Sequence, residues 1–97
     1  MSQQEIQAAE TFIESVENQL DEMVNDADSD TLFISGYLRG HIMLAAGYLE
    51  MEEKLNIQAL IEKTNASLEQ AIAAGELNDN DQTLVNNMWQ NLQNSQL

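Results

Sequence analysis

The stretch LFISGYLRGHIMLAAGYL, residues 32–49, decides the fold because it reads as one long helix with a broad apolar side. At about 100° per residue, that side collects the following residues: Phe33, Ile34, Tyr37, Leu38, Ile42, Leu44, Ala45, Tyr48 and Leu49. Gly36, Gly40 and Gly47 align beside them at positions i, i+4 and i+11. A glycine inside a helix costs roughly 0.5–1 kcal/mol relative to alanine. Three glycines on one stripe therefore predict that something comes close to this backbone.

Apolar residues recur at helical spacing along almost all of the 97-residue chain, which contains no proline and is the size of one domain. The pattern predicts helices over about residues 4–26, 29–53, 56–75 and 79–94, with a frayed C-terminal tail. The expected caps are Asp28 or Ser29, then Asn56, then Asn78 with Asp81, and Gly75 is expected to end the third helix. Short connections favour antiparallel neighbours. We therefore expect an all-α, single-domain, up-and-down antiparallel bundle of four helices, with the second helix the most buried.

The charge balance is strongly acidic, with 17 acidic residues against 3 Lys and Arg and a formal net charge of -14. Such a charge argues against nucleic acid and anionic membranes as partners, because both are polyanions. It is compatible with a basic protein partner or simply with solubility. The chain has no cysteine, no signal-peptide pattern and no apolar run of about 18 residues. A cytoplasmic location follows by elimination.

An acidic ridge is predicted on the first helix, where Glu10, Glu14, Glu17 and Asp21 follow one another at spacings of four, three and four. Like charges at these spacings destabilise an isolated helix by a few tenths of a kcal/mol per pair. No Lys or Arg occurs in the first 38 residues to relieve them. The ridge is either a surface for a basic partner or a solvated outer face.

No metal site is predicted, although Asp26, Asp28 and Asp30 alternate like the first ligands of an EF-hand loop. Thr31 stands where that loop needs its sharp-turn glycine, and Tyr37 stands where it needs the bidentate glutamate. We therefore interpret these aspartates as a loop and a helix cap.

No catalytic constellation is recognisable either. His41 lacks an evident orienting partner, and we expect it to be a core histidine bonded to a backbone carbonyl or a hydroxyl group. The chain shows no phosphate loop, no nucleophile beside a base and no paired carboxylates in an apolar setting. We expect neither enzymatic activity nor a cofactor.

Arg39 allows two interpretations. Its planar guanidinium suits a carboxylate, so it either pairs with an acid such as Glu50 or one on the first helix, or serves as a recognition point. In the second case the binding surface comprises Ser35, Gly36, Arg39, Gly40 and Trp89. The structural alternatives are that Trp89 caps the core and that the glycines let two helices pack closely.

Two motifs, SGYLRGH at residues 35–41 and GEL…D…LV..MW at residues 75–89, resemble the YfcL family of small uncharacterised bacterial proteins. The resemblance covers roughly residues 17–93 and leaves the early part of the acidic ridge outside. The matching residues are Phe33, Ser35, Gly36, Tyr37, Leu38, Arg39, Gly40, His41, Gly75, Glu76, Leu77, Asp81, Leu84, Val85, Met88 and Trp89. It implies a small helical cytoplasmic protein from a gammaproteobacterium and brings no activity, substrate or cofactor.

The preferred hypothesis is a non-catalytic protein-interaction module, in which the acidic ridge attracts a basic partner and the SGYLRGH helix gives specificity. The alternative is a small-ligand module that holds an acidic metabolite or a peptide carboxylate at Arg39 beside the glycine stripe. A third hypothesis is an acidic decoy that imitates nucleic acid. It is weaker because a row of four carboxylates on one helix is too short to imitate a phosphate backbone. Like-charged protomers repel, so we expect a monomer or a weak homodimer.

Overall fold

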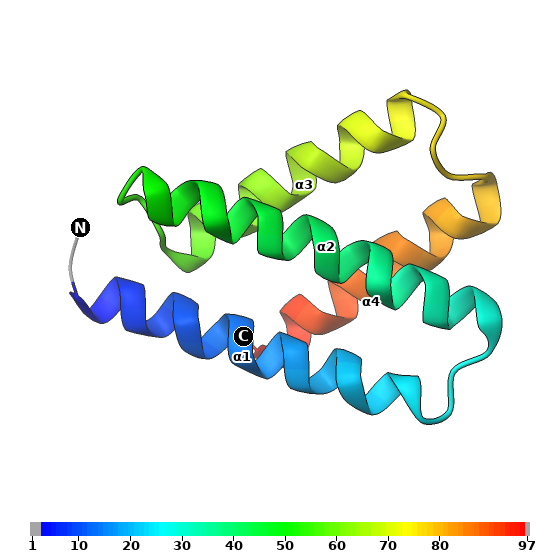
Figure 1. Ribbon diagram of the computed structural model, residues 1–97, viewed down its shortest axis with the longest axis horizontal. Helices are drawn as coiled ribbons and strands as arrows, with labels where there is room; N and C mark the ends of the chain where they lie inside the picture. Colours follow the sequence, from blue (N-terminus) through cyan, green and yellow to red (C-terminus); the bar gives the residue numbers. More distant parts are fainter. Residues whose placement is uncertain (1–2, 97) are drawn as a thin grey trace.

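The computed structural model describes residues 3–96, which form four α-helices (Figure 1). They are α1 (Gln3–Val24), α2 (Ser29–Met51), α3 (Ile57–Ala73) and α4 (Asp79–Gln96). The prediction of an all-α, four-helix fold is confirmed, and the helix ends lie within two residues of the expected positions. The last helix continues to Gln96 instead of fraying after residue 94, and Leu97 lies outside the described residues. None of these helices is long and apolar enough to span a bilayer.

Side-chain caps begin three of the helices. The carboxylate or amide oxygens of Asp28, Asn56 and Asn78 each accept a hydrogen bond from the backbone amide three residues further on, at 2.8 Å in every case. These bonds satisfy amides that have no partner within the helix. The hydrogen bond from the Thr31 amide stabilises the charged form of the Asp28 carboxylate and so lowers its pKa from the usual 3.8.

The C-terminal ends of α2 and α3 share one backbone pattern. After α2, the amide of Lys54 donates to the carbonyl of Leu49 at 2.8 Å, and after α3 the amide of Glu76 donates to Ala71 at 3.1 Å. This pattern places the preceding residue in the left-handed region. Gly75 occupies it at φ 79°, as the sequence predicted, whereas α2 uses Glu53 at φ 58°. A side chain in that region carries a cost that glycine avoids.

The second helix is the centre of the packing: α1 and α2 each contact all three other helices, and the contacts of α2 are the more extensive. Figure 1 shows α2 passing in front of α4, while the consecutive helices α3 and α4 diverge from their connecting loop. The bundle is therefore organised around one helix and is not a square array in which every consecutive pair packs along its length. The prediction that the second helix is the most buried agrees with its seven buried residues, more than in any of the other three helices.

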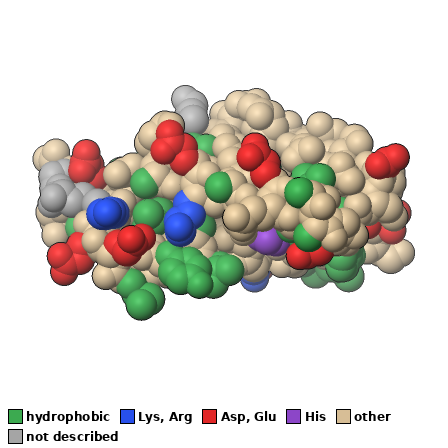
Figure 2. All heavy atoms as spheres, turned by 90° about the horizontal axis from the view of Figure 1, so that it is seen from above, with side chains coloured by type: hydrophobic (Ala, Val, Ile, Leu, Met, Phe, Trp, Pro, Cys, Tyr) green, Lys and Arg blue, Asp and Glu red, His purple; other side chains and the backbone are tan. Residues whose placement is uncertain are grey.

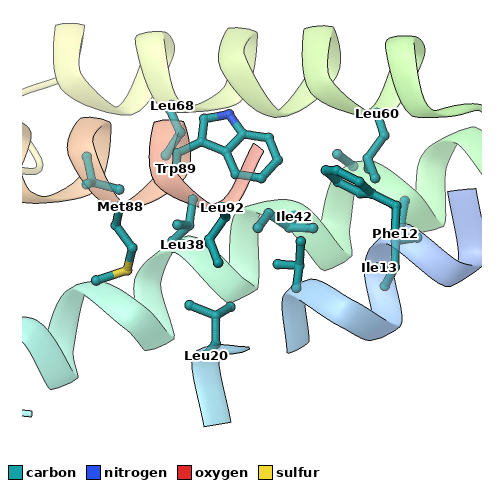
Figure 3. Packing of buried hydrophobic residues seen from close by; sticks show 14 of the residues in the cluster. Phe12, Ile13, Leu20, Leu38, Ile42, Leu60, Leu68, Met88, Trp89 and Leu92 are labelled. Carbon is teal, nitrogen blue, oxygen red and sulfur yellow. The ribbon is translucent and has the colours of Figure 1, made fainter. Parts of the chain in front are cut away.

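All four helices contribute to a single hydrophobic core (Figure 3). Within it, Phe12 of α1 and Trp89 of α4 meet edge to face, with ring centroids 6.4 Å apart. The largest side chains that are fully buried are Leu20, Ile34, Leu38, Ile42, Leu60 and Leu92. Thr64 of α3 is also fully buried, and its hydroxyl has no hydrogen-bond partner in the described part of the chain.

The broad apolar side of α2 is only partly buried. Phe33, Leu44 and Tyr48 on it are 54%, 56% and 52% exposed, and the nearby Met51 is 82% exposed. The apolar arc of α2 is wider than the surface that its three neighbours cover. Helical periodicity gives the width of such an arc but does not say which part another helix will cover. We call the uncovered part the outer face of α2; it comprises Phe33, Gly36, Tyr37, Gly40, Leu44, Gly47, Tyr48 and Met51.

Candidate functional site

The acidic ridge of α1 forms one wall of an open groove of about 510 Å³ between α1 and α2. Because Phe12, Val16 and Leu20 hold the opposite side of α1 in the core, the carboxylates are turned towards this groove. Its acidic lining residues are Glu10, Glu14, Glu17, Asp21 and Glu50. Its apolar lining comes from Ile13, Met43, Ala46 and Gly47. We call this feature the acidic groove.

Arg39 lies next to the acidic groove, because its partner Asp21 is one of the groove's lining residues. Its guanidinium pairs with the Asp21 carboxylate and donates to the backbone carbonyl of Glu17 at 3.3 Å. This arrangement agrees with the interpretation of Arg39 as an ion-pair partner of the first helix, and it ties α2 to α1. Among residues 3–96, Glu10, Glu14, Glu17 and Glu50 have no ion-pair partner.

Internal packing does not explain the three glycines of α2. A Cβ atom built at Gly36, Gly40 or Gly47 would meet no atom of residues 3–96 within 4 Å other than the adjacent backbone of α2. The neighbouring helices would therefore accept alanine at each position without moving. Gly47 borders the acidic groove, whereas Gly36 and Gly40 lie with Leu44 on a shallow depression of the outer face, about 260 Å³ in volume.

The structure brings together only part of the predicted α2 surface. Gly36, Arg39 and Gly40 reach the surface, but Ser35 is 4% exposed, and its hydroxyl donates to the Leu32 carbonyl at 2.9 Å. Trp89 is 3% exposed and belongs to the core, as its structural alternative proposed, and its Nε1 donates to Asn65 of α3 at 2.7 Å. Ser35 and Trp89 therefore support the fold and do not belong to the surface that contains Gly36, Arg39 and Gly40.

Three contacts fasten α2 to α3 and the segment that follows it. His41 is half-buried, and its Nδ1 lies 2.6 Å from the hydroxyl oxygen of Ser67, a hydroxyl partner of the kind expected. The Tyr37 hydroxyl donates to Glu76 at 2.8 Å. Burial first, then this hydrogen bond and the charge of Glu76, raise the pKa of Tyr37 to about 12. Lys63 lies over the Tyr48 ring, 5.4 Å from its centroid.

Sequence reasoning missed several members of these surfaces. Glu50 follows Gly47 by one helical turn, and this spacing could have assigned it to the acidic groove. Lys63 and Glu76 could not have been found, because their positions depend on how α3 crosses α2. Within the described range 3–96, no cluster of three or more His, Asp or Glu side chains is arranged to hold a metal ion. The chemistry that the acidic groove can supply to a ligand is carboxylates without ion-pair partners within residues 3–96, next to apolar side chains.

The sequence profile of the YfcL protein family matches residues 10–94. A curated relative, "Uncharacterized protein YfcL" from Escherichia coli (strain K12), is 51% identical over 73 residues, which is 75% of this chain and 79% of the relative. No solved structure matches the chain significantly. The chain therefore belongs to the YfcL family, as its two motifs indicated. The matched range begins at residue 10, so it includes the whole acidic ridge, whose early part was expected to lie outside it.

Proposed function

We propose that this member of the YfcL family is a non-catalytic protein-interaction module that binds a basic segment of a partner protein in the acidic groove. The observation that carries the proposal is the concentration of unpaired carboxylates on one open surface. Glu10, Glu14 and Glu17 from α1 face Glu50 from α2, and none has an ion-pair partner within residues 3–96. The fold places them together although like charges at these spacings disfavour the helix.

The lining of the groove favours a side chain with an apolar stem and a cationic head. Met43, Ala46 and Gly47 provide apolar contact between the two acidic walls. Lysine and arginine bury their methylene stems against such surfaces while their charges remain near water and carboxylates. Complementary charge of this kind accelerates association and selects the partner more than it adds raw affinity.

The small-ligand alternative has less support. A ligand carboxylate at Arg39 would have to displace Asp21 from the guanidinium and the contact with the Glu17 carbonyl. It would also approach Glu14 and Glu17 along the same groove. These charges repel an acidic metabolite, whereas they attract a basic segment.

The test is affinity capture from a bacterial lysate with the wild type and with the variant Glu10→Gln/Glu14→Gln/Glu17→Gln. The matched control, Glu22→Gln/Glu62→Gln/Glu69→Gln, removes the same number of charges from exposed positions outside the acidic groove. We expect one partner to be retained by the wild type and the control and lost by the groove variant.

Salt provides the second arm of this test. The Debye length falls from about 10 Å at 0.1 M to about 3 Å at 1 M ionic strength. Capture should therefore weaken steeply as salt rises. A partner that binds equally to the groove variant, or whose retention does not depend on salt, would contradict the proposal.

A further inference from the structure

We infer that the outer face of α2 binds a second copy of the same chain, with the two α2 helices antiparallel and centred on Ile42. This inference concerns the outer face of α2, which shares only Gly47 with the acidic groove, and it does not depend on the proposed function. It begins from exposed apolar area: Phe33, Leu44 and Tyr48 are each more than half exposed, and Met51 is 82% exposed. Figure 2 shows hydrophobic side chains projecting from the lower edge of the molecule, the side on which α2 lies.

The spacing on this face is that of a helix-pairing seam. Phe33, Tyr37, Gly40, Leu44, Gly47 and Met51 follow one another at spacings of four, three, four, three and four. Alternating steps of three and four are the heptad pattern by which two helices pack along their length. Phe33, Leu44 and Met51 of this seam are more than half exposed, so no helix within residues 3–96 covers them, whereas Tyr37 is partly buried against the core. The pattern therefore calls for a helix from outside the chain.

The seam is complementary to its own reversed copy. In an antiparallel pair centred on Ile42, residues equally far from the centre on opposite sides share a layer. Leu44 then shares a layer with Gly40 of the second copy, and Tyr37 with Gly47 of the second copy. Tyr48 likewise shares a layer with Gly36 of the second copy, and Phe33 shares a layer with Met51 of the second copy. Each glycine on the face is thus paired with a large side chain.

This pairing accounts for glycines that the single chain does not need. Apart from the adjacent backbone of α2, a Cβ at Gly36, Gly40 or Gly47 would meet no atom of the described chain within 4 Å. In the antiparallel pair the same positions leave room for Tyr48, Leu44 and Tyr37 of the second copy, in that order. Small residues opposite large ones let two helices approach closely while the interface remains filled.

Charge on the α3 side of α2 favours the same orientation. Lys63 lies beside Tyr48, and Glu76 binds Tyr37, so the two charges flank opposite ends of the outer face. The two-fold axis of an antiparallel pair keeps the α3 side of both copies on one side of the interface. It therefore brings Lys63 of each copy towards Glu76 of the other copy, which gives two equivalent pairs of opposite charge. The two-fold axis of a parallel pair would instead put the α3 sides of the two copies on opposite sides of the interface, where Lys63 of one copy could not approach Glu76 of the other.

The net charge of -14 opposes association, and the same axis places both acidic grooves on one side. Self-association should therefore strengthen as salt rises, whereas binding of a basic segment to the acidic groove should weaken. The opposite salt dependences make failure of this inference distinguishable from failure of the proposed function.

Disulfide trapping tests the orientation of the two helices. Because the native chain has no cysteine, only the introduced cysteines can form a disulfide. Phe33 and Met51 are exposed positions about 27 Å apart along one helix, so neither substitution disturbs the core. An oxidised mixture of the full-length variants Phe33→Cys and Met51→Cys should give a cross-linked dimer that joins one of each. Each variant alone should remain mostly uncross-linked. Preferential cross-linking of either variant with itself, or no cross-linking in the mixture, would overturn the antiparallel pair.

Sedimentation equilibrium over a concentration series at low and high salt gives an independent measurement. Leu44→Glu should abolish the dimer, while the control Leu32→Glu should retain it, because Leu32 is a 46% exposed leucine of the same helix outside the seam. Lys63→Glu should weaken the dimer, and adding Glu76→Lys to it should restore the affinity. A wild-type chain that stays monomeric at high salt and high concentration, or a dimer that Leu44→Glu leaves intact, would overturn the inference.

Discussion

Replacing the three α2 glycines should make the single chain more stable. The change is Gly36→Ala/Gly40→Ala/Gly47→Ala, and each new methyl group would point into open space, with no atom of residues 3–96 within 4 Å apart from the adjacent backbone of α2 itself. Each substitution then contributes only the helix-propensity difference, roughly 0.5–1 kcal/mol. Because none of the three disturbs a neighbouring helix, we sum the three differences to about 1.5–3 kcal/mol of extra free energy of unfolding. At about 4 °C or more per kcal/mol for a domain of this size, the melting temperature should rise by at least about 6 °C.

The assay is urea unfolding followed by tryptophan fluorescence, at low salt and low protein concentration so that the monomer is measured. Trp89 is 3% exposed and packs against Phe12, so its emission should report loss of the core. The control is Gly75→Ala, because Gly75 has φ 79° and a Cβ is unfavourable there. We expect this control to destabilise the chain by about 1–2 kcal/mol.

The same alanine variant should lose self-association in sedimentation equilibrium, because the added methyl groups occupy the space assigned to the second copy. Higher stability together with weaker association is the expected combination. Unchanged or lower stability of the triple variant would refute the reasoning that these glycines have no role inside the single chain.

Four further outcomes follow from individual residues. Glu53→Gly should stabilise the chain by about 1 kcal/mol in urea unfolding, because Glu53 has φ 58° at the end of α2, where α3 uses glycine. Thr64→Val should stabilise it by about 1 kcal/mol in the same assay, because the buried hydroxyl has no partner. The pKa of Tyr37 is raised to about 12, so this group contributes stability that is complete below its usual pKa of 10 and is lost as the pH rises through about 12. Glu76→Gln should lower the pKa of Tyr37 in an ultraviolet absorbance titration. The lowered pKa of Asp28 implies stability that is present above its usual 3.8 and lost as the pH falls through the lowered value; Asp28→Asn, which retains a capping oxygen, should reduce this acid dependence in thermal melts.

Local interactions were the part of the structure that the sequence could predict. Asp28, Asn56 and Asn78 cap helices through bonds to amides three residues away, so their neighbours in the sequence determine the outcome. Gly75 ends α3 for the same kind of reason. The acidic ridge was also predictable, because it depends only on residue spacing along α1.

Relations between helices were not predictable in the same way. The partner of Arg39 remained open between Glu50 and the first helix, and only the packing of α1 against α2 brings Asp21 to it. Trp89 remained open between a cap of the core and a binding surface, and only the packing of α4 against α1 places it beside Phe12 in the core. Leu44 was predicted only to lie on the apolar side of α2, because an apolar residue at a helical spacing is the same signal whether its partner lies in this chain or another.

Under the two proposals, the acidic groove and the outer face of α2 would influence each other. The two-fold axis places both acidic grooves on one side of the dimer, so their repulsion opposes association. A basic segment bound in either groove would neutralise part of this charge and so strengthen the dimer. By thermodynamic linkage, the dimer would then bind the basic segment more tightly than the monomer does. α2 is suited to such coupling because it lines the groove with Gly47 and Glu50 on one flank and carries Leu44 and Tyr48 on its outer face, so both surfaces belong to one rigid helix.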